Sequence, residues 1–150
     1  NEISWTNWNT TAMAKEILDF TKKLIQFRKQ HKILHLSSEP RLMDSKSYGL
    51  PDMSYHGSKA WYADFSHFNR HFSVMYCGKY ATIDGKEDEA DLFIAYNMFW
   101  EMIKFGIPSA RNKRQWKVVF ATDSGFKEPS DGIERMLQVP PRSIVVLMAK

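Results

Sequence analysis

The residues best suited to bind a metal ion are two pairs of histidines, each pair four positions apart. His67 and His71 form one pair, and His31 and His35 form the other. Two histidines at this spacing on a helix can ligate zinc, but neither pair contains the glutamate of a His-Glu-x-x-His motif. A zinc site also needs three or four converging ligands. We therefore interpret these histidines as polar residues of loops and of a helix terminus, and we expect no metal ion and no cofactor.

The carboxylates best placed to act together are Glu87, Asp88, Glu89 and Asp91, which follow Asp84-Gly85. A carboxylate pair can cleave a glycosidic bond when its two members lie in differently tuned environments. Four carboxylates beside a predicted turn are instead typical of a solvated loop, and nothing in this stretch indicates burial. We expect no catalytic acid pair here.

Cys77 is the only cysteine, and it lies in a predicted strand with no base close to it in sequence. The chain also lacks a Gly-x-Ser-x-Gly nucleophile motif and a glycine-rich phosphate loop. A lone cysteine excludes an intrachain disulfide and fits a reducing compartment, so we expect a cytoplasmic location. No residue is predicted to be catalytic.

A basic stretch, Arg111-Asn112-Lys113-Arg114-Gln115-Trp116-Lys117, combines cations with an aromatic side chain. Such a stretch can bind a phosphate backbone or stack on unpaired bases. The net charge of +4 is mild for 150 residues, however. We favour a charged hairpin turn, with Trp116 as the first inward residue of the next strand, and keep nucleic-acid binding as a remote alternative.

Five tryptophans are the most informative side chains, because an indole can fill a core or offer a flat platform to a sugar ring. We expect Trp100 and Trp116, which lie in predicted strands, to pack in the core. Trp5 and Trp8 lie in a polar segment, NEISWTNWNT, where contact with a sugar is plausible. They are the candidate substrate-binding residues.

The elements that must position these residues are one helix followed by many strands. Apolar residues recur at helical spacing from about residue 11 to residue 31, with Thr10 or Thr11 as the N-terminal cap. From about residue 40 short alternating runs are separated by turn residues, a pattern typical of an antiparallel β-sandwich. The clearest predicted strands are 72–77, 91–97, 100–105, 115–121 and 143–148. No apolar run is long enough to span a membrane, and no signal peptide is evident.

The segments of the chain, in order, resemble the C-terminal region of α-amylase-superfamily (glycoside hydrolase family 13) debranching enzymes, of the isoamylase, pullulanase or glycogen-debranching type. The ordered series is more specific than any one segment and covers essentially the whole chain. Phe99 is a departure, because relatives often carry histidine there. The segments are NEISWTNW, LDFTKKLIQFRKQHKIL, LPDMSYHGSKAW, VMYCGKY, DLFIAYNMFWEMIKFGIP, QWKVVFATDSG and VPPRSIVVLMAK.

The resemblance implies that residues 1–35 end a catalytic (β/α)₈ barrel, as a loop plus the last helix, and that residues 36–150 form the C-terminal β-sandwich domain. The family's catalytic carboxylates lie on barrel strands, which this likeness places before residue 1. The chain starts without methionine, as a fragment would. The resemblance thus implies a chain that is not an enzyme alone, from a parent glycoside hydrolase that cuts α-1,6 bonds of glycogen or starch.

The implied partners are the parent's own barrel and, through the parent, an α-glucan substrate, with no nucleic acid and no membrane. In this interpretation the helix packs partly on the barrel, and the isolated chain must fold the helix onto the sandwich or expose apolar surface. One alternative stays open: the chain is a carbohydrate-binding module whose exposed aromatic residues grip a glucan.

Overall fold

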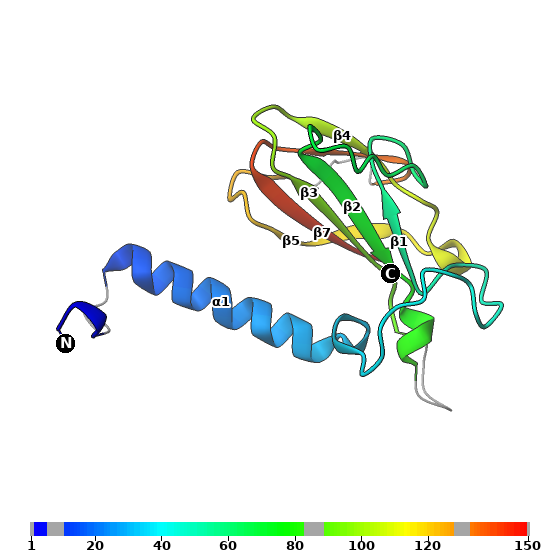
Figure 1. The fold of residues 1–150 in the computed structure, drawn as a ribbon, viewed down its shortest axis with the longest axis horizontal. Coiled ribbons are helices and arrows are strands. Elements are labelled where there is room, and N and C mark those ends of the chain that lie inside the picture. The colour runs from blue at the N-terminus through cyan, green and yellow to red at the C-terminus, as the bar shows by residue number, and fades with distance from the viewer. Residues whose placement is uncertain (1, 6–10, 83–88, 128–132, 150) are drawn as a thin grey trace.

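The computed structural model describes residues 2–5, 11–82, 89–127 and 133–149. Within these ranges the chain forms an α-helix, α1 (Ala12–Gln30), then seven β-strands, with short 3₁₀ turns between some of them (Figure 1). The strands are antiparallel wherever they pair. The predicted mainly β fold preceded by one amphipathic helix is confirmed.

Five strands make the larger sheet, in the spatial order β1-β2-β3-β7-β5. Two further strands, β4 and β6, make a separate hairpin-like sheet that packs on one face of the larger sheet. The strand bounds are β1 (Met53–His56), β2 (His71–Tyr76), β3 (Leu92–Asn97), β4 (Ile103–Gly106), β5 (Trp116–Ala121), β6 (Met136–Val139) and β7 (Ser143–Ala149).

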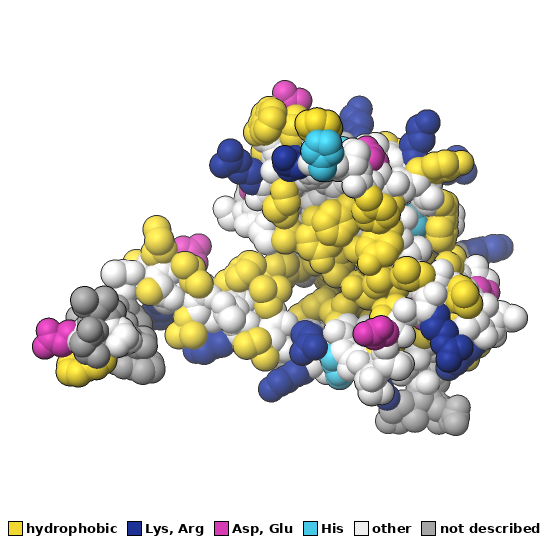
Figure 2. Space-filling view, in the orientation of Figure 1, with side chains coloured by type: hydrophobic (Ala, Val, Ile, Leu, Met, Phe, Trp, Pro, Cys, Tyr) yellow, Lys and Arg dark blue, Asp and Glu magenta, His cyan; other side chains and the backbone are white. Residues whose placement is uncertain are grey.

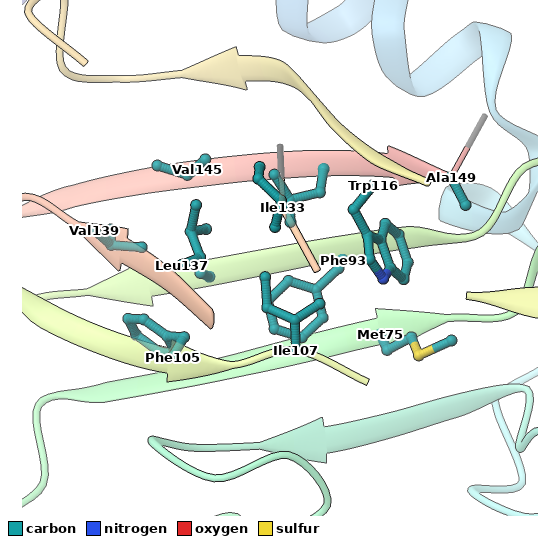
Figure 3. Close-up of a cluster of buried hydrophobic side chains, with 12 residues drawn as sticks. Met75, Phe93, Phe105, Ile107, Trp116, Ile133, Leu137, Val139, Val145 and Ala149 are labelled. Carbon is teal, nitrogen blue, oxygen red and sulfur yellow. The ribbon is translucent and has the colours of Figure 1, made fainter. Parts of the chain in front are cut away.

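The main core lies between the two sheets, which together form an open sandwich. Phe93 and Val145 point from the larger sheet toward Phe105 and Leu137 of the smaller one (Figure 3). Trp116 is buried beside them, and its indole N–H donates to the carbonyl of Pro108 at 2.8 Å. The prediction that Trp116 packs in the core is confirmed.

Trp100, which the sequence placed in a core-facing strand, is 65% exposed and lies in a bend before β4. That prediction was wrong because the buried Asn97 side chain amide donates to the carbonyl of Glu101 at 2.8 Å, which holds residues 98–101 as a loop. The strand begins only at Ile103. The sequence also missed β1 and β6, which at four residues each are too short for alternation to stand out.

Helix α1 begins where predicted, because the Thr11 hydroxyl accepts from the backbone N–H of Ala14 at 3.2 Å. It then extends away from the sheets (Figure 1) and buries none of its residues. Two of its apolar side chains pack against the rest of the chain: the ring of Phe20 lies 5.1 Å from that of Phe120, and Phe27 packs against the cluster of Ile33, Ala81 and Leu92. Neither α1 nor any shorter helix in the described ranges is long and apolar enough to cross a membrane.

Candidate functional site

The larger sheet has two apolar faces, although only one of them meets the second sheet. Side chains alternate along a strand, so the residues next to the core-facing Met75, Phe93 and Val145 point to the opposite, outer face. An antiparallel sheet with one solvated face normally carries polar residues there. The outer face of this sheet therefore needs its own explanation.

Strand register sets a row of apolar side chains across all five strands of the outer face. Tyr55 pairs with Val74, Val74 with Ile94, Ile94 with Val146, and Val146 with Phe120. Figure 2 shows hydrophobic side chains gathered over this part of the molecule. This row is continuous from one edge of the sheet to the other.

A second row runs beside the first toward one end of the sheet. Phe72 of β2 pairs with Tyr96 of β3, and their rings stack with centroids 4.8 Å apart and planes 14° apart. Ile144 of β7 follows Tyr96 in register. Burial raises the pKa of Tyr96 above its usual value, which reflects how apolar the face is around the phenol.

Exposed apolar residues of α1 extend this surface along the helix. Met13, Ile17 and Ile25 are all more than half exposed, with Leu18 and Leu24 somewhat less so. We call the two rows and this helical stripe the apolar surface. Among the described residues, Phe20 and Phe27 of α1 are the helical side chains that pack against the sandwich, and the stripe around them stays open to solvent.

A pocket of about 300 Å³ lies at the end of the sheet where β2 begins and β3 ends. Phe65, Phe72 and Met98 supply its apolar wall, and Asp64 and Arg70 supply charged groups. The two loops that form it are joined by a 2.8 Å hydrogen bond from the N–H of Met98 to the carbonyl of Arg70. We call this site the loop pocket.

The loop pocket was not predicted from the sequence, although aromatic residues in a polar loop could have indicated it. Phe65 and Phe68 lie among polar residues, in the same way as Trp5 and Trp8, and are 71% and 78% exposed. Hydrogen bonds from Ser66 hold the pKa of Asp64 below its usual value, so this carboxylate stays ionised at neutral pH.

Asp91 is not the solvated carboxylate that the sequence predicted. It is fully buried and accepts from the backbone N–H of Gly78 at 2.9 Å and from Nε of Arg111 at 2.8 Å. Arg111, expected in an exposed basic turn, is buried with it. Glu89 accepts from the backbone N–H groups of Lys32 and Ile33, so these side chains stabilise the fold. Glu87 and Asp88 lie outside the described residues.

The histidines are held in separate environments. His71 opens β2, where its Nε2 lies 3.0 Å from Oγ of Ser58, and His67 lies in the exposed loop before it. His31 ends α1, and His35 lies in the 3₁₀ turn that follows. Within the described ranges no group of three histidine, cysteine, aspartate or glutamate residues is close enough to hold a metal ion.

Cys77 is completely buried, and burial, reinforced by the nearby Asp91 charge, raises the pKa of its thiol to about 11. A thiol in this state is a poor nucleophile at neutral pH. The side chain therefore fits a core position rather than a catalytic one.

Of the two candidate substrate-binding residues, Trp5 lies within the described residues and Trp8 does not. Trp5 is 71% exposed, just after the 3₁₀ turn Glu2–Ser4. Trp8 lies outside the described residues. The role of both in sugar binding remains a prediction.

Comparison with known proteins connects these features to an enzyme superfamily. No family model matches the chain. The chain is similar to an isoamylase from Flavobacterium sp., with 24% identity over 161 aligned positions that cover 98% of this chain and 20% of that protein. Among solved structures, the α-amylase of H. orenii matches with a TM-score of 0.49 and 15% identity, over 89% of this chain and 20% of that one.

The chain thus spans about a fifth of the length of the isoamylase that it matches. The alignment runs from end to end of the chain, as the ordered motifs predicted. The resemblance to the C-terminal region of α-amylase-superfamily glycoside hydrolases is therefore confirmed.

Proposed function

We propose that the chain is a non-catalytic domain of a longer glycoside hydrolase and that it packs against the catalytic barrel of that enzyme through the apolar surface. The observation that carries this proposal is the second apolar face of the five-stranded sheet, continued by the exposed stripe of α1. The central side chains of the first row, Val74, Ile94 and Val146, are buried within the chain, so the exposed part of this surface is mainly the helical stripe. Exposed apolar patches mark interaction sites in soluble proteins.

The two described carboxylates of the acidic run have structural partners, which favours a structural role for them. Asp91 is committed to Arg111, and Glu89 to the turn that follows α1. Cleavage of a glycosidic bond needs two carboxyl groups facing one another across the substrate. We therefore assign catalysis to the barrel, and we expect this domain to stabilise it.

For the parent we propose hydrolysis of α-1,6 branch linkages in glycogen or starch. The similarity to an isoamylase supports this choice over other members of the superfamily. Bond specificity depends on residues of the barrel, so it must be tested on the longer protein.

The experiment compares the 150-residue chain with the same chain preceded by its native upstream sequence. Both are incubated with a branched α-glucan, and reducing ends are measured. We expect hydrolysis only by the longer protein. Activity of the chain alone would overturn the structural role.

Variants of the apolar surface test the packing itself. Ile17→Asp on α1 should lower the unfolding midpoint of the longer protein and leave that of the 150-residue chain nearly unchanged, because Ile17 is exposed in the chain alone. Met136→Asp is the matched control, because Met136 is also apolar and is 50% exposed, against 59% for Ile17, and lies on β6 in the other sheet. Equal effects of Ile17→Asp on both proteins would contradict the proposed interface.

A carbohydrate-binding role is a second candidate. The loop pocket favours it, because the pocket combines exposed aromatic side chains with charged groups.

A further inference from the structure

The loop pocket has features that the rest of the surface does not explain. It lies where the outer face of the sheet meets two loops, residues 57–70 and 98–102. Sheet packing would call for a purely apolar patch, whereas this pocket has Asp64 and Arg70 beside Phe65 and Met98. A small concave site of aromatic residues with a few polar groups is typical of a ligand pocket.

The loop that carries Phe65 is held in place before any ligand arrives. Asn69 accepts from the N–H of His71 at 3.1 Å, and its amide donates to the carbonyls of His71 and Asp64. The guanidinium of Arg70 donates to the carbonyl of His67 at 2.6 Å. A prepared site loses less conformational entropy on binding than a flexible one.

The second loop is fixed from beneath by Asn97. Its buried amide donates to the carbonyls of Glu101, Val139 and Pro140 at 2.8–3.0 Å. The same loop carries Trp100, whose ring stacks on Phe99 with centroids 4.1 Å apart. Aromatic side chains are therefore presented on both loops at this end of the sheet.

The chemistry of the pocket selects a neutral polyhydroxylated ligand. The exposed ring of Phe65 offers a face to the apolar C–H side of a pyranose. The Asp64 carboxylate accepts hydrogen bonds and the Arg70 guanidinium donates them, so hydroxyl groups can bond to both. The opposite charges disfavour a polyanion, because a phosphate that approached Arg70 would also face Asp64.

We propose that the loop pocket binds a glucose unit of an α-glucan, with Phe65 as the stacking platform and with Asp64 and Arg70 bonding to the sugar hydroxyls. The choice of an α-glucan rests on the proposed function, and the choice of a sugar rests on the pocket itself. The domain then holds the polysaccharide at a point outside the active site of the barrel.

The test titrates the 150-residue chain with maltoheptaose and, separately, with the β-linked cellohexaose, and follows backbone amide NMR shifts. We expect saturable shifts at millimolar maltoheptaose in residues 64–72 and at Met98, with a weaker response to cellohexaose. No response to either sugar would overturn the site, and an equal response to both would overturn the α-glucan assignment.

Three variants identify the binding residues. Phe65→Ala and Asp64→Asn should each weaken maltoheptaose binding by about tenfold or more, since the first removes the stacking ring and the second removes the charge that accepts from the sugar hydroxyls. Both positions are exposed, and the dispersion of the NMR spectrum checks that each variant folds. Trp5→Ala is the control, an exposed aromatic residue at the other candidate sugar contact. Binding that Trp5→Ala abolishes, or that Phe65→Ala leaves unchanged, would move the site away from the loop pocket.

A protein occupant is the competing outcome. In the longer protein, an adjoining domain seated on the pocket would protect these loops from hydrogen exchange and abolish maltoheptaose shifts there, which would overturn the glucan site. The Ile17→Asp measurement decides the proposed function independently, so a failure of one proposal leaves the other to stand on its own result.

Discussion

At the scale of single residues, Asp91 joins segments of the described chain that are distant in sequence. Its carboxylate receives hydrogen bonds from Gly78 and from both the backbone and the side chain of Arg111. It thereby ties the start of β3 to two turns that are distant in sequence. From the sequence, Asp91 was predicted to be solvated as part of an acidic run. That prediction was wrong because burial depends on which segments the fold brings together.

The Asp91→Asn variant tests this role. The substitution keeps the size of the side chain but removes the charge that Asp91 presents to the buried Arg111, so we expect a loss of about 3–5 kcal/mol in the free energy of unfolding. Urea denaturation measures it. The control is Asp19→Asn, in the exposed 3.9 Å pair with Lys22, where a change within about 1 kcal/mol is expected. Similar losses in the two variants would contradict the assignment.

His56 makes stability depend on pH. It is fully buried, its Nδ1 accepts from the backbone N–H of Trp61 at 2.7 Å, and burial lowers the pKa of the ring from 6.5 to about 4. The unfolded chain binds the proton more readily, so stability should fall as pH drops from about 6.5 to about 4, by roughly 3 kcal/mol from this residue.

Urea denaturation at several pH values measures this dependence. Other histidines with lowered pKa, His31 and His71, act in the same direction. The comparison is therefore between the wild-type chain and His56→Asn, whose amide oxygen can still accept from Trp61. The variant should show a clearly shallower loss between pH 6.5 and 4. Parallel curves would refute the role of His56.

At the scale of elements, α1 is a helix with few tertiary contacts. Its described packing against the sandwich depends on Phe20 and Phe27, while β3 is hydrogen-bonded on both sides. We expect amides of α1 to exchange with deuterium much faster than those of β3 and β7, because most helical stability in proteins comes from packing. Equal protection of α1 and β3 would show that the helix is more firmly docked than these contacts imply.

The positions of the helix and of the longer strands were the features best predicted from the sequence. The helical period and a capping threonine located α1 within a residue or two, and alternation located β2, β3, β5 and β7. The prediction for Trp100 failed because the composition of an aromatic run such as NMFWEM does not distinguish a strand from a loop. The hydrogen bonds of the buried Asn97 amide, to Glu101 nearby and to Val139 and Pro140 far along the chain, hold this segment as a loop.

At the scale of the whole molecule, the sequence and its likeness to known enzymes predicted a sandwich but neither the strand order nor the loop pocket. Asp64, Phe65 and Arg70 meet Met98 only because β2 and β3 are neighbours. The apolar outer face was visible in part, since Leu92, Ile94 and Tyr96 alternate with the core-facing Phe93 and Ala95 along β3. A strand that is apolar on both sides indicates burial on both sides, and Leu92 and Ile94 of the outer face are indeed buried, Leu92 in a cluster with Ile33 and Ala81.

The place of β7 in the sheet has a consequence for synthesis on the ribosome. It is the last strand along the chain, yet it lies between β3 and β5 and pairs with both. Until residues 143–149 leave the exit tunnel, β5 lacks its neighbouring strand in the sheet and β3 keeps one bare edge, so the nascent domain presents open strand edges to chaperones or to neighbouring chains. A chain that stopped before residue 143 would therefore separate β5 from the other three strands of the sheet, as well as losing β7 itself.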